Sequence, residues 1–391
     1  MVISWERAFH AFGPARGGHE LLDVLRRGEL ERYACEHPRE GLDPYSFLWS
    51  ALYCAGRITP ATVLGLRYLA SALTAEDFGG DDPTLREAVV WWLREVTRAV
   101  VDGTYLDQAR RMARRRDDPA VNEWLDEYLR HERSVHDWGE GDEPGRVLLA
   151  AAEADCFDAL PEVFEPVASL LVARQPERLR TVAASAAAAL VRHPELHRRR
   201  EAITAYHLAE AARGTPLHRA SMLLGLGELG GPTLPWLDDP DLGVRVCAAL
   251  APDLAGTAAA TRVLRSAALD PAALHHAFGD VRLPQLLSLN EAVAEALCER
   301  VEDLGPLLDG ATAAVAYDGP AGDGVLCEPY LRKAFPRGVL HGGTDAHRAL
   351  ARAVAASDNP WRDDKRWTAV FARTGLPAER EAWLAAARSD G

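Results

Sequence analysis

The clearest indication of the fold is the sequence Asp239-Pro240-Asp241-Leu242-Gly243-Val244-Arg245-Val246-Cys247-Ala248-Ala249-Leu250-Ala251. Aspartate is favoured at the start of a helix because its carboxylate accepts backbone N–H bonds, and proline suits the first helical turn, where its missing N–H has no use. Apolar and small residues follow, which give a helix one face to bury and let a neighbouring helix approach closely. The stretch predicts a turn and then a tightly packed helix.

The same turn recurs along the chain. Asp-Asp-Pro occurs at positions 81–83, 117–119 and 238–240, with related pairs at 270–271 and 359–360. In each of the first three we expect an aspartate to cap the next helix. The spacings of 36 residues from Asp82 to Asp118 and of 31 residues from Asp239 to Asp270 suit a repeat unit of two helices.

Helical periodicity fills the segments between these turns. Apolar residues recur at i, i+3, i+4 and i+7 in three clear sets, which are Leu66, Leu69, Ala70 and Leu73, then Leu160, Val163, Phe164 and Val167, then Ala260, Val263, Leu264, Ala267 and Ala268. Each set makes one apolar stripe on a helix. We expect about eighteen to twenty helices joined by short turns. The fold predicted is all-α, a curved solenoid of stacked antiparallel helix pairs.

Two further segments extend the pattern to the ends of the chain. One is His10-Ala11-Phe12-Gly13-Pro14-Ala15, followed by Leu48-Trp49-Ser50-Ala51-Leu52; the other is the tail with Phe335-Pro336, Trp361 and Gly375-Leu376-Pro377. Together with the stretch at 239–251, they resemble HEAT-repeat proteins common in actinobacteria, of the PBS-lyase HEAT-like kind. That family has no single assigned activity, so the resemblance implies a fold more than a function.

The resemblance also implies roles for two residues and an organisation for the chain. In HEAT repeats the arginine at the position of Arg245 commonly bonds to the turn aspartate of an adjacent repeat, so structural roles are expected for Asp239 and Arg245. The whole chain, 1–391, is expected to be one HEAT-like domain. Its N-terminal cap region would be 1–75, its repeats 76–324 and its C-terminal cap region 325–391.

Composition limits the kinds of partner. The formal net charge is −14, which argues against general binding to nucleic acid, because phosphate backbones are bound mainly by Lys and Arg. The six cysteines are far apart and form no CxxC motif, as in reduced intracellular chains. Neither a secretory signal nor a long apolar segment is present, so a cytoplasmic location without membrane contact is expected.

Aromatic residues are the first candidates for a binding surface. Trp91 and Trp92 are adjacent, and adjacent helical positions differ by about 100°. With Val89, Leu93, Val96 and Val100 on the buried face, one indole can reach the edge of the stack, although both can also belong to the core. Trp124 and Tyr128 continue this aromatic-rich part of the chain, and an exposed Trp is a good anchor for a partner.

A histidine cluster is the second candidate. In the segment 131–137, Glu132 and His136 are four residues apart and share a helix face, whereas His131 and His136 align less well. The zinc signature H-E-x-x-H is absent. Basic residues are also favoured at the C-terminal end of a helix, which accounts for His131 without a ligand. We therefore expect neither a metal nor a cofactor, and no catalytic residue can be assigned.

Three functions remain open. The first is a scaffold that binds a partner protein on the concave face of the stack. The acidic net charge favours a basic partner, and by analogy the chain could act as an immunity-type or adaptor protein. The second is an enzyme or small-molecule binder of specialised metabolism with a pocket in the groove. The third follows HEAT-like DNA glycosylases, which pair a Trp with an acidic residue, as Trp124 and Asp126 or Trp91 and Glu95 could here.

Overall fold

A computed structural model describes residues 4–36, 42–103, 105–132, 134, 142–279, 281–286, 288–319, 325–340, 343–362 and 365–388. Within these ranges the chain forms twenty α-helices, several short 3₁₀ turns, one π-helical turn and two hairpins of two strands each. The prediction of an all-α fold is confirmed. None of the helices in these ranges combines the length and apolar character that crossing a bilayer requires.

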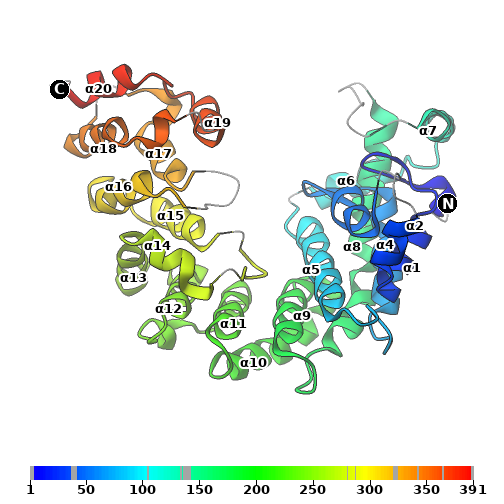
Figure 1. Cartoon of the computed structure of the whole chain (residues 1–391). Helices are drawn as coiled ribbons and strands as arrows, with labels where there is room; N and C mark the ends of the chain where they lie inside the picture. Colours follow the sequence, from blue (N-terminus) through cyan, green and yellow to red (C-terminus); the bar gives the residue numbers. More distant parts are fainter. Residues whose placement is uncertain are drawn as a thin grey trace. The chain divides into compact units, whose positions relative to one another are not determined.

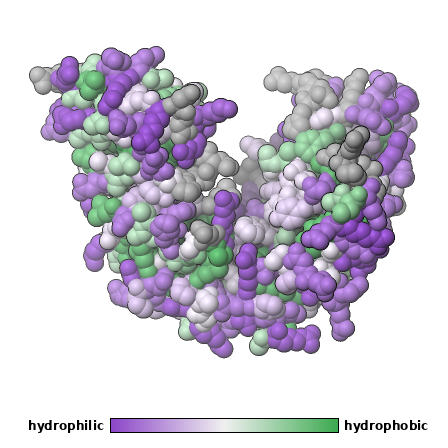
Figure 2. Space-filling model, in the orientation of Figure 1, coloured by the Kyte–Doolittle hydropathy of each residue, from purple (hydrophilic) through white to green (hydrophobic). Residues whose placement is uncertain are grey.

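The chain divides into two compact units, Met1–Ala205 and Tyr206–Gly391, and the division falls within helix α10 (Arg200–Ala211). Each unit is described by itself. The predicted division into cap and repeat regions stays a prediction. Figure 2 shows hydrophilic residues over most of the visible face, which is the pattern expected when the apolar stripes of helices are buried.

The first unit is organised around one long helix. Helix α8 (Glu143–Ala168) packs against α4, α5, α6, α7 and α9, and α5 also packs against α9 (Figure 1). The remaining elements are η1 (Trp5–Arg7), β1 (Phe9–His10), β2 (Gly13–Pro14), α1 (Gly18–Arg27), α2 (Leu30–Glu36), α3 (Pro44–Ser46), η2 (Phe47–Ala51), β3 (Tyr53–Cys54), β4 (Arg57–Ile58), α4 (Pro60–Ala72), α5 (Pro83–Val101), α6 (Leu106–Ala113), α7 (Pro119–His131), α9 (Glu177–Leu190) and η4 (Pro194–Arg199).

The second unit contains helices that pack on near neighbours in sequence. Figure 1 shows one row of helices, α13, α16, α18 and α20, and beside it a second row, α15, α17 and α19. Within each row, every helix contacts the next one. The elements are α11 (Pro216–Glu228), η5 (Leu234–Trp236), α12 (Leu242–Ala249), η6 (Pro252–Leu254), α13 (Ala258–Ala268), α14 (Pro271–His275), η7 (His276–Phe278), α15 (Leu289–Arg300), η8 (Gly305–Leu307), α16 (Leu308–Ala316), α17 (Glu328–Ala334), η9 (Pro336–Gly338), α18 (Asp345–Ala356), η10 (Asn359–Trp361), α19 (Lys365–Thr374) and α20 (Arg380–Arg388).

The predicted caps form in part. Asp82 accepts the N–H of Thr84 at 2.8 Å, so it caps α5 as expected. At the third turn the cap is Asp241, which accepts the N–H of Val244 at 3.0 Å, and Pro240 lies before the helix rather than in its first turn. Asp118 makes no side-chain cap bond on α7; its carboxylate pairs with Arg115 instead.

The turn at 239–241 holds together differently from the expectation for Arg245. The Arg245 guanidinium donates to the backbone carbonyls of Asp239 and Pro240, the latter at 2.9 Å. The Asp239 carboxylate is paired with Arg219, which lies on the preceding helix α11. Both residues are therefore structural, but the bond from a neighbouring helix to the turn aspartate is made by Arg219. Arg245 closes its own turn because its side chain lies directly over those carbonyls.

Candidate functional site

The first β-hairpin forms the base of a pocket in the first unit. Strands β1 and β2 are antiparallel, with Phe9 opposite Pro14 and His10 opposite Gly13. Phe9 is fully buried among α7 and α8, in a cluster with Val121, Leu125, Tyr128, Leu129, Val147 and Leu148. The hairpin tip is tied to the helical layer by a 3.0 Å bond from the N–H of Ala11 to the carbonyl of Ala51. These contacts fix the hairpin rigidly.

His10 is a buried polar side chain of this hairpin. It is 7% exposed, and its Nδ1 accepts the N–H of Phe12 at 3.1 Å. Burial lowers the pKa of the imidazole from 6.5 to about 4, so the ring is neutral at pH 7. With Nδ1 used as an acceptor, the neutral ring carries its proton on Nε2. His10 is therefore a fixed hydrogen-bond donor.

The pocket itself has a volume of about 670 Å³. It is lined by His10, Phe12, Gly13, Pro14, Arg16, Leu42 and Glu132. Phe12 is 42% exposed, so an aromatic surface is available to a ligand. Arg16 lies 3.9 Å from Glu6, and Glu132 ends α7 in the left-handed conformation, at φ 49°. The pocket thus combines one neutral donor, one cation, one carboxylate and an aromatic ring.

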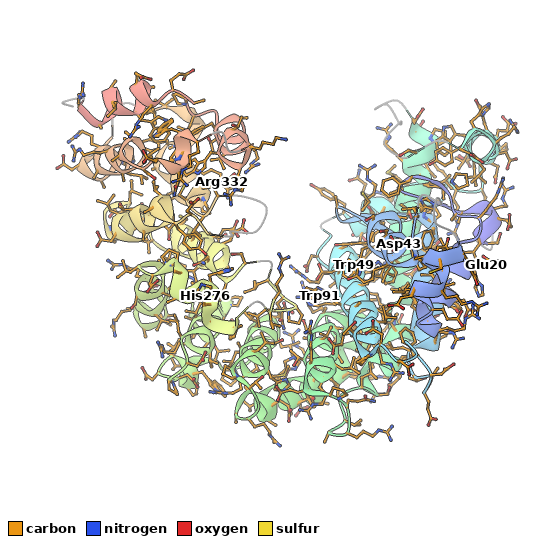
Figure 3. All side chains as sticks on the ribbon, in the orientation of Figure 1. Glu20, Asp43, Trp49, Trp91, His276 and Arg332 are labelled. Atoms are coloured by element: carbon orange, nitrogen blue, oxygen red, sulfur yellow. The ribbon has the colours of Figure 1, made fainter. Side chains whose placement is uncertain are left out.

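A π-helical turn connects this pocket to a pair of indoles. In η2 the N–H of Leu52 bonds to the carbonyl of Phe47 at 3.0 Å. Phe47 meets His10 edge to face, with ring centroids 5.5 Å apart. Trp49, two residues on, meets Trp91 of α5 at 90° with centroids 6.4 Å apart, and Figure 3 labels both indoles. Such turns are rare and frequently occur at functional sites.

Charged residues lie beside this indole pair on α5. Arg94 is fully buried, and its Nη1 lies 2.6 Å from a carboxylate oxygen of Glu95. Burial, and then the Glu95 carboxylate, raise the pKa of Tyr53 on β3. Trp91 and Glu95 are four residues apart and so share one face of the helix. The Trp91 indole and the Glu95 carboxylate therefore lie on the same face of α5.

The predicted site residues separate into core and surface. Trp92 is fully buried, whereas Trp91, midway along α5, is half-buried. Trp124 and Tyr128 stack on each other with centroids 5.0 Å apart, and both pack on Phe9, so they support the hairpin from behind. Of the adjacent pair Trp91 and Trp92, Trp91 is therefore the indole that reaches the surface.

The described members of the histidine cluster, His131 and Glu132, have different surroundings. His131 is exposed, and its Nδ1 lies 2.9 Å from the carbonyl of Glu127, one turn earlier. Glu132 lines the hairpin pocket, and His136 lies outside the described residues. Within the described ranges, no group of three or more His, Cys, Asp or Glu side chains is placed to hold a metal ion.

The acidic partners proposed for a DNA glycosylase are engaged elsewhere. Asp126 pairs with Arg7 at 2.9 Å, and Glu95 pairs with Arg94. Each carboxylate is therefore already held by an arginine. Neither aspartate nor glutamate stands free beside its tryptophan in the way that chemistry requires.

Sequence reasoning missed His10 and Trp49 as site residues. Both lie in segments that resemble a repeat family, and Trp49 also belongs to the aromatic-rich N-terminal half of the chain. The available signal was a histidine three residues before the pair Gly13-Pro14, where a short hairpin can hold a side chain in a fixed position. Comparison of the chain with family models, with curated proteins and with solved structures found no match.

Proposed function

We propose that this chain is a HEAT-like repeat scaffold that binds a partner protein. The observation that carries the proposal is the packing in the second unit, where each helix from α13 onward contacts helices close to it in sequence. Packing limited to near neighbours is typical of repeat stacks, and their usual role is to offer an extended surface to another macromolecule.

Polar contacts between successive helices support the repeat interpretation. The Arg373 guanidinium of α19 donates to both carboxylate oxygens of Glu328 on α17. Lys333 of α17 donates to the carbonyl of Cys298 on α15 at 2.9 Å. A bidentate Arg–carboxylate pair fixes geometry as well as adding energy. Contacts of this kind set the spacing between neighbouring helices and keep such a surface in shape.

The docking surface we favour is the indole pair of Trp49 and Trp91 with the exposed Phe12. Large aromatic side chains dominate binding energy at protein interfaces and bring little conformational entropy cost. The net charge of −14 favours a basic partner, because complementary charge accelerates encounter. We expect binding that weakens as salt is raised.

The proposal is tested by native capture from the lysate of the source cells. The full chain is tagged, its bound proteins are identified by mass spectrometry, and cross-linking locates the contact. Trp91→Ala should weaken capture about tenfold or more, as expected for a hot-spot residue. Tyr105→Ala is the matched control, since Tyr105 is 69% exposed and has no place in the proposed surface.

Two outcomes would contradict the proposal, the first its docking surface and the second the scaffold itself. One is a stoichiometric partner whose capture is equal for the wild type, Trp91→Ala and Tyr105→Ala, which would move the docking surface elsewhere. The other is a chain that captures no protein at any salt concentration tested. The second outcome would leave the following candidate as the better function.

A small-molecule binding role is the second candidate, and the hairpin pocket favours it. Its volume of about 670 Å³ lies within the roughly 300–1,000 Å³ of ligand sites, and His10 supplies an oriented donor. Native mass spectrometry of the purified chain should then show a retained metabolite. His10→Phe should release that metabolite because the hydrogen-bond donor is lost. The control His131→Phe, which changes an exposed histidine, should keep it. Retention by both variants would exclude the hairpin pocket.

A further inference from the structure

A second pocket, in the second unit, has the opposite charge from the protein as a whole. It has a volume of about 210 Å³. Helix α13 supplies Arg262, Arg265, Ser266, Ala268 and Leu269, helix α15 supplies Leu297, and the start of η8 and α16 supplies Pro306, Leu307, Asp309 and Gly310. Two guanidinium groups against one carboxylate leave the lining positive, in a chain whose formal net charge is −14.

Both arginines are exposed to solvent, and neither has a counter-ion among the described residues. They are three residues apart on α13, so both lie on the same face of that helix, and like charges at this spacing repel. Within the described part of the chain, neither Arg262 nor Arg265 makes an ion pair or a hydrogen bond, although Asp309 lines the same pocket. Arg373, Arg219 and Arg348 of the same unit are by contrast each paired with a carboxylate.

We propose that this pocket binds a small organic oxyanion, with its carboxylate or phosphate head on Arg262 and Arg265 and a short apolar body against the leucines. This site is separate from the docking surface of the proposed scaffold. Guanidinium groups match the planar geometry of carboxylate and phosphate and hold them by paired N–H bonds. Ser266 adds a hydroxyl donor from the same helix.

The other walls decide the size and character of the ligand. Leu269 is 55% exposed, and with Leu297, Pro306 and Leu307 it gives the pocket an apolar side. The volume of about 210 Å³ limits the ligand to a small molecule. The N-terminal turn of η8 and α16 adds the positive end of a helix dipole, and α16 has no side-chain cap there. A benzoate-sized anion fits this description better than a nucleotide.

Binding is measured on the full chain with benzoate and inorganic phosphate as probes. Saturation-transfer NMR detects bound benzoate, and calorimetry gives the dissociation constant of each probe. The double variant Arg262→Met, Arg265→Met keeps the aliphatic length and removes both charges, so benzoate affinity should fall at least about tenfold. Asp309→Asn should instead strengthen binding, because it removes the one carboxylate of the lining.

The matched control is Arg282→Met, which removes an exposed arginine of the same unit that does not line the pocket. It should leave the benzoate affinity unchanged, and thermal melts should show all variants folded. Tight phosphate binding without benzoate binding would restrict the ligand to phosphate groups and overturn the apolar half of the proposal. Equal loss of affinity in Arg282→Met and the double variant, or no binding of either probe at millimolar concentration, would overturn the site itself.

Discussion

His10 shows what burial does to a single side chain. The ordinary imidazole binds a proton near pH 6.5, but in the folded chain burial lowers the pKa of His10 to about 4. Between these two values the unfolded chain binds more protons at this position than the folded chain does. The folded state is therefore stabilised above pH 6.5 and loses that stability as the pH falls toward 4.

This gives a prediction for acid stability. At pH 5 the His10 imidazole should cost the fold about 2 kcal/mol relative to pH 7. His10→Asn keeps an acceptor near the N–H of Phe12 but does not titrate, so its free energy of unfolding should change less between pH 7 and pH 5. Urea unfolding at the two pH values measures the difference.

The control for this prediction is the exposed variant His131→Asn. Its loss of stability between pH 7 and pH 5 should equal that of the wild type. His193, which is also buried and has a lowered pKa, is present in all three chains and cancels in the comparison. An identical pH dependence for wild type and His10→Asn would show that His10 is protonated without cost.

At the scale of one element, helix α5 depends on an ion pair within its own turn. The Arg94 guanidinium is fully buried, and Glu95, with 23% of its side chain exposed, neutralises it at 2.6 Å. Breaking a buried pair leaves one charge without compensation, which costs more than the pair itself contributes. The pair also stands next to Trp91, so its loss would disturb the surface that we propose for docking.

We predict that Glu95→Ala destabilises the first unit by about 3 kcal/mol, because the buried guanidinium loses the carboxylate that lies 2.6 Å from it. The double variant Arg94→Met, Glu95→Ala should recover much of that loss. Thermal unfolding of the three chains measures both effects. Glu162→Ala is the control, since its partner Arg67 is exposed and such pairs contribute less than about 1 kcal/mol. A cost for Glu95→Ala as small as that of the control would contradict the interpretation.

The turn before α12 gives a second prediction at this scale. Asp239→Ala removes the carboxylate that holds Arg219, so we expect a loss of about 2–3 kcal/mol of stability. Arg245→Met removes only bonds to two carbonyls and should cost less, about 1 kcal/mol. Urea unfolding ranks the two variants. The reverse ranking would restore the arrangement expected from the repeat family.

Local rules predicted the helices well and the site poorly. Apolar periodicity placed Leu66, Leu69 and Ala70 on the buried face of α4, because neighbours within one helix decide that pattern. Asp118 failed as a cap because Arg115 competes for its carboxylate, which is a choice that spacing alone does not reveal. The hairpin pocket joins His10, Leu42 and Glu132, which are far apart in sequence and meet only through tertiary packing.

At the scale of the whole molecule, the two compact units predict two unfolding transitions. Each unit has its own apolar core, and units of this kind generally unfold separately. Each also contains a close approach between glycines. A Cβ on Gly28 would meet the Gly79 carbonyl oxygen, and one on Gly338 would meet that of Gly375; both glycines have positive φ.

Gly28→Ala should therefore lower only one transition and Gly338→Ala only the other, each by at least about 2 kcal/mol, since the left-handed conformation alone costs about 1–2 kcal/mol for alanine. Differential scanning calorimetry resolves the two. Gly256→Ala is the control, because nothing lies within 4 Å of its added carbon. A single transition that both variants shift equally would mean that the chain unfolds as one cooperative body.

The π-helical turn η2 has a consequence for how this surface can change over evolution. Its bond from Leu52 to Phe47 spans one residue more than an α-helical bond does, so the turn contains one extra residue. Deleting that residue would restore an ordinary α-helical turn. The side chains on one side of the deletion would then rotate by about 100° relative to those on the other side. Phe47 and Trp49 could then no longer face His10 and Trp91 together. Lineages that lose the insertion should lose the indole pair with it, and those that keep it should keep both.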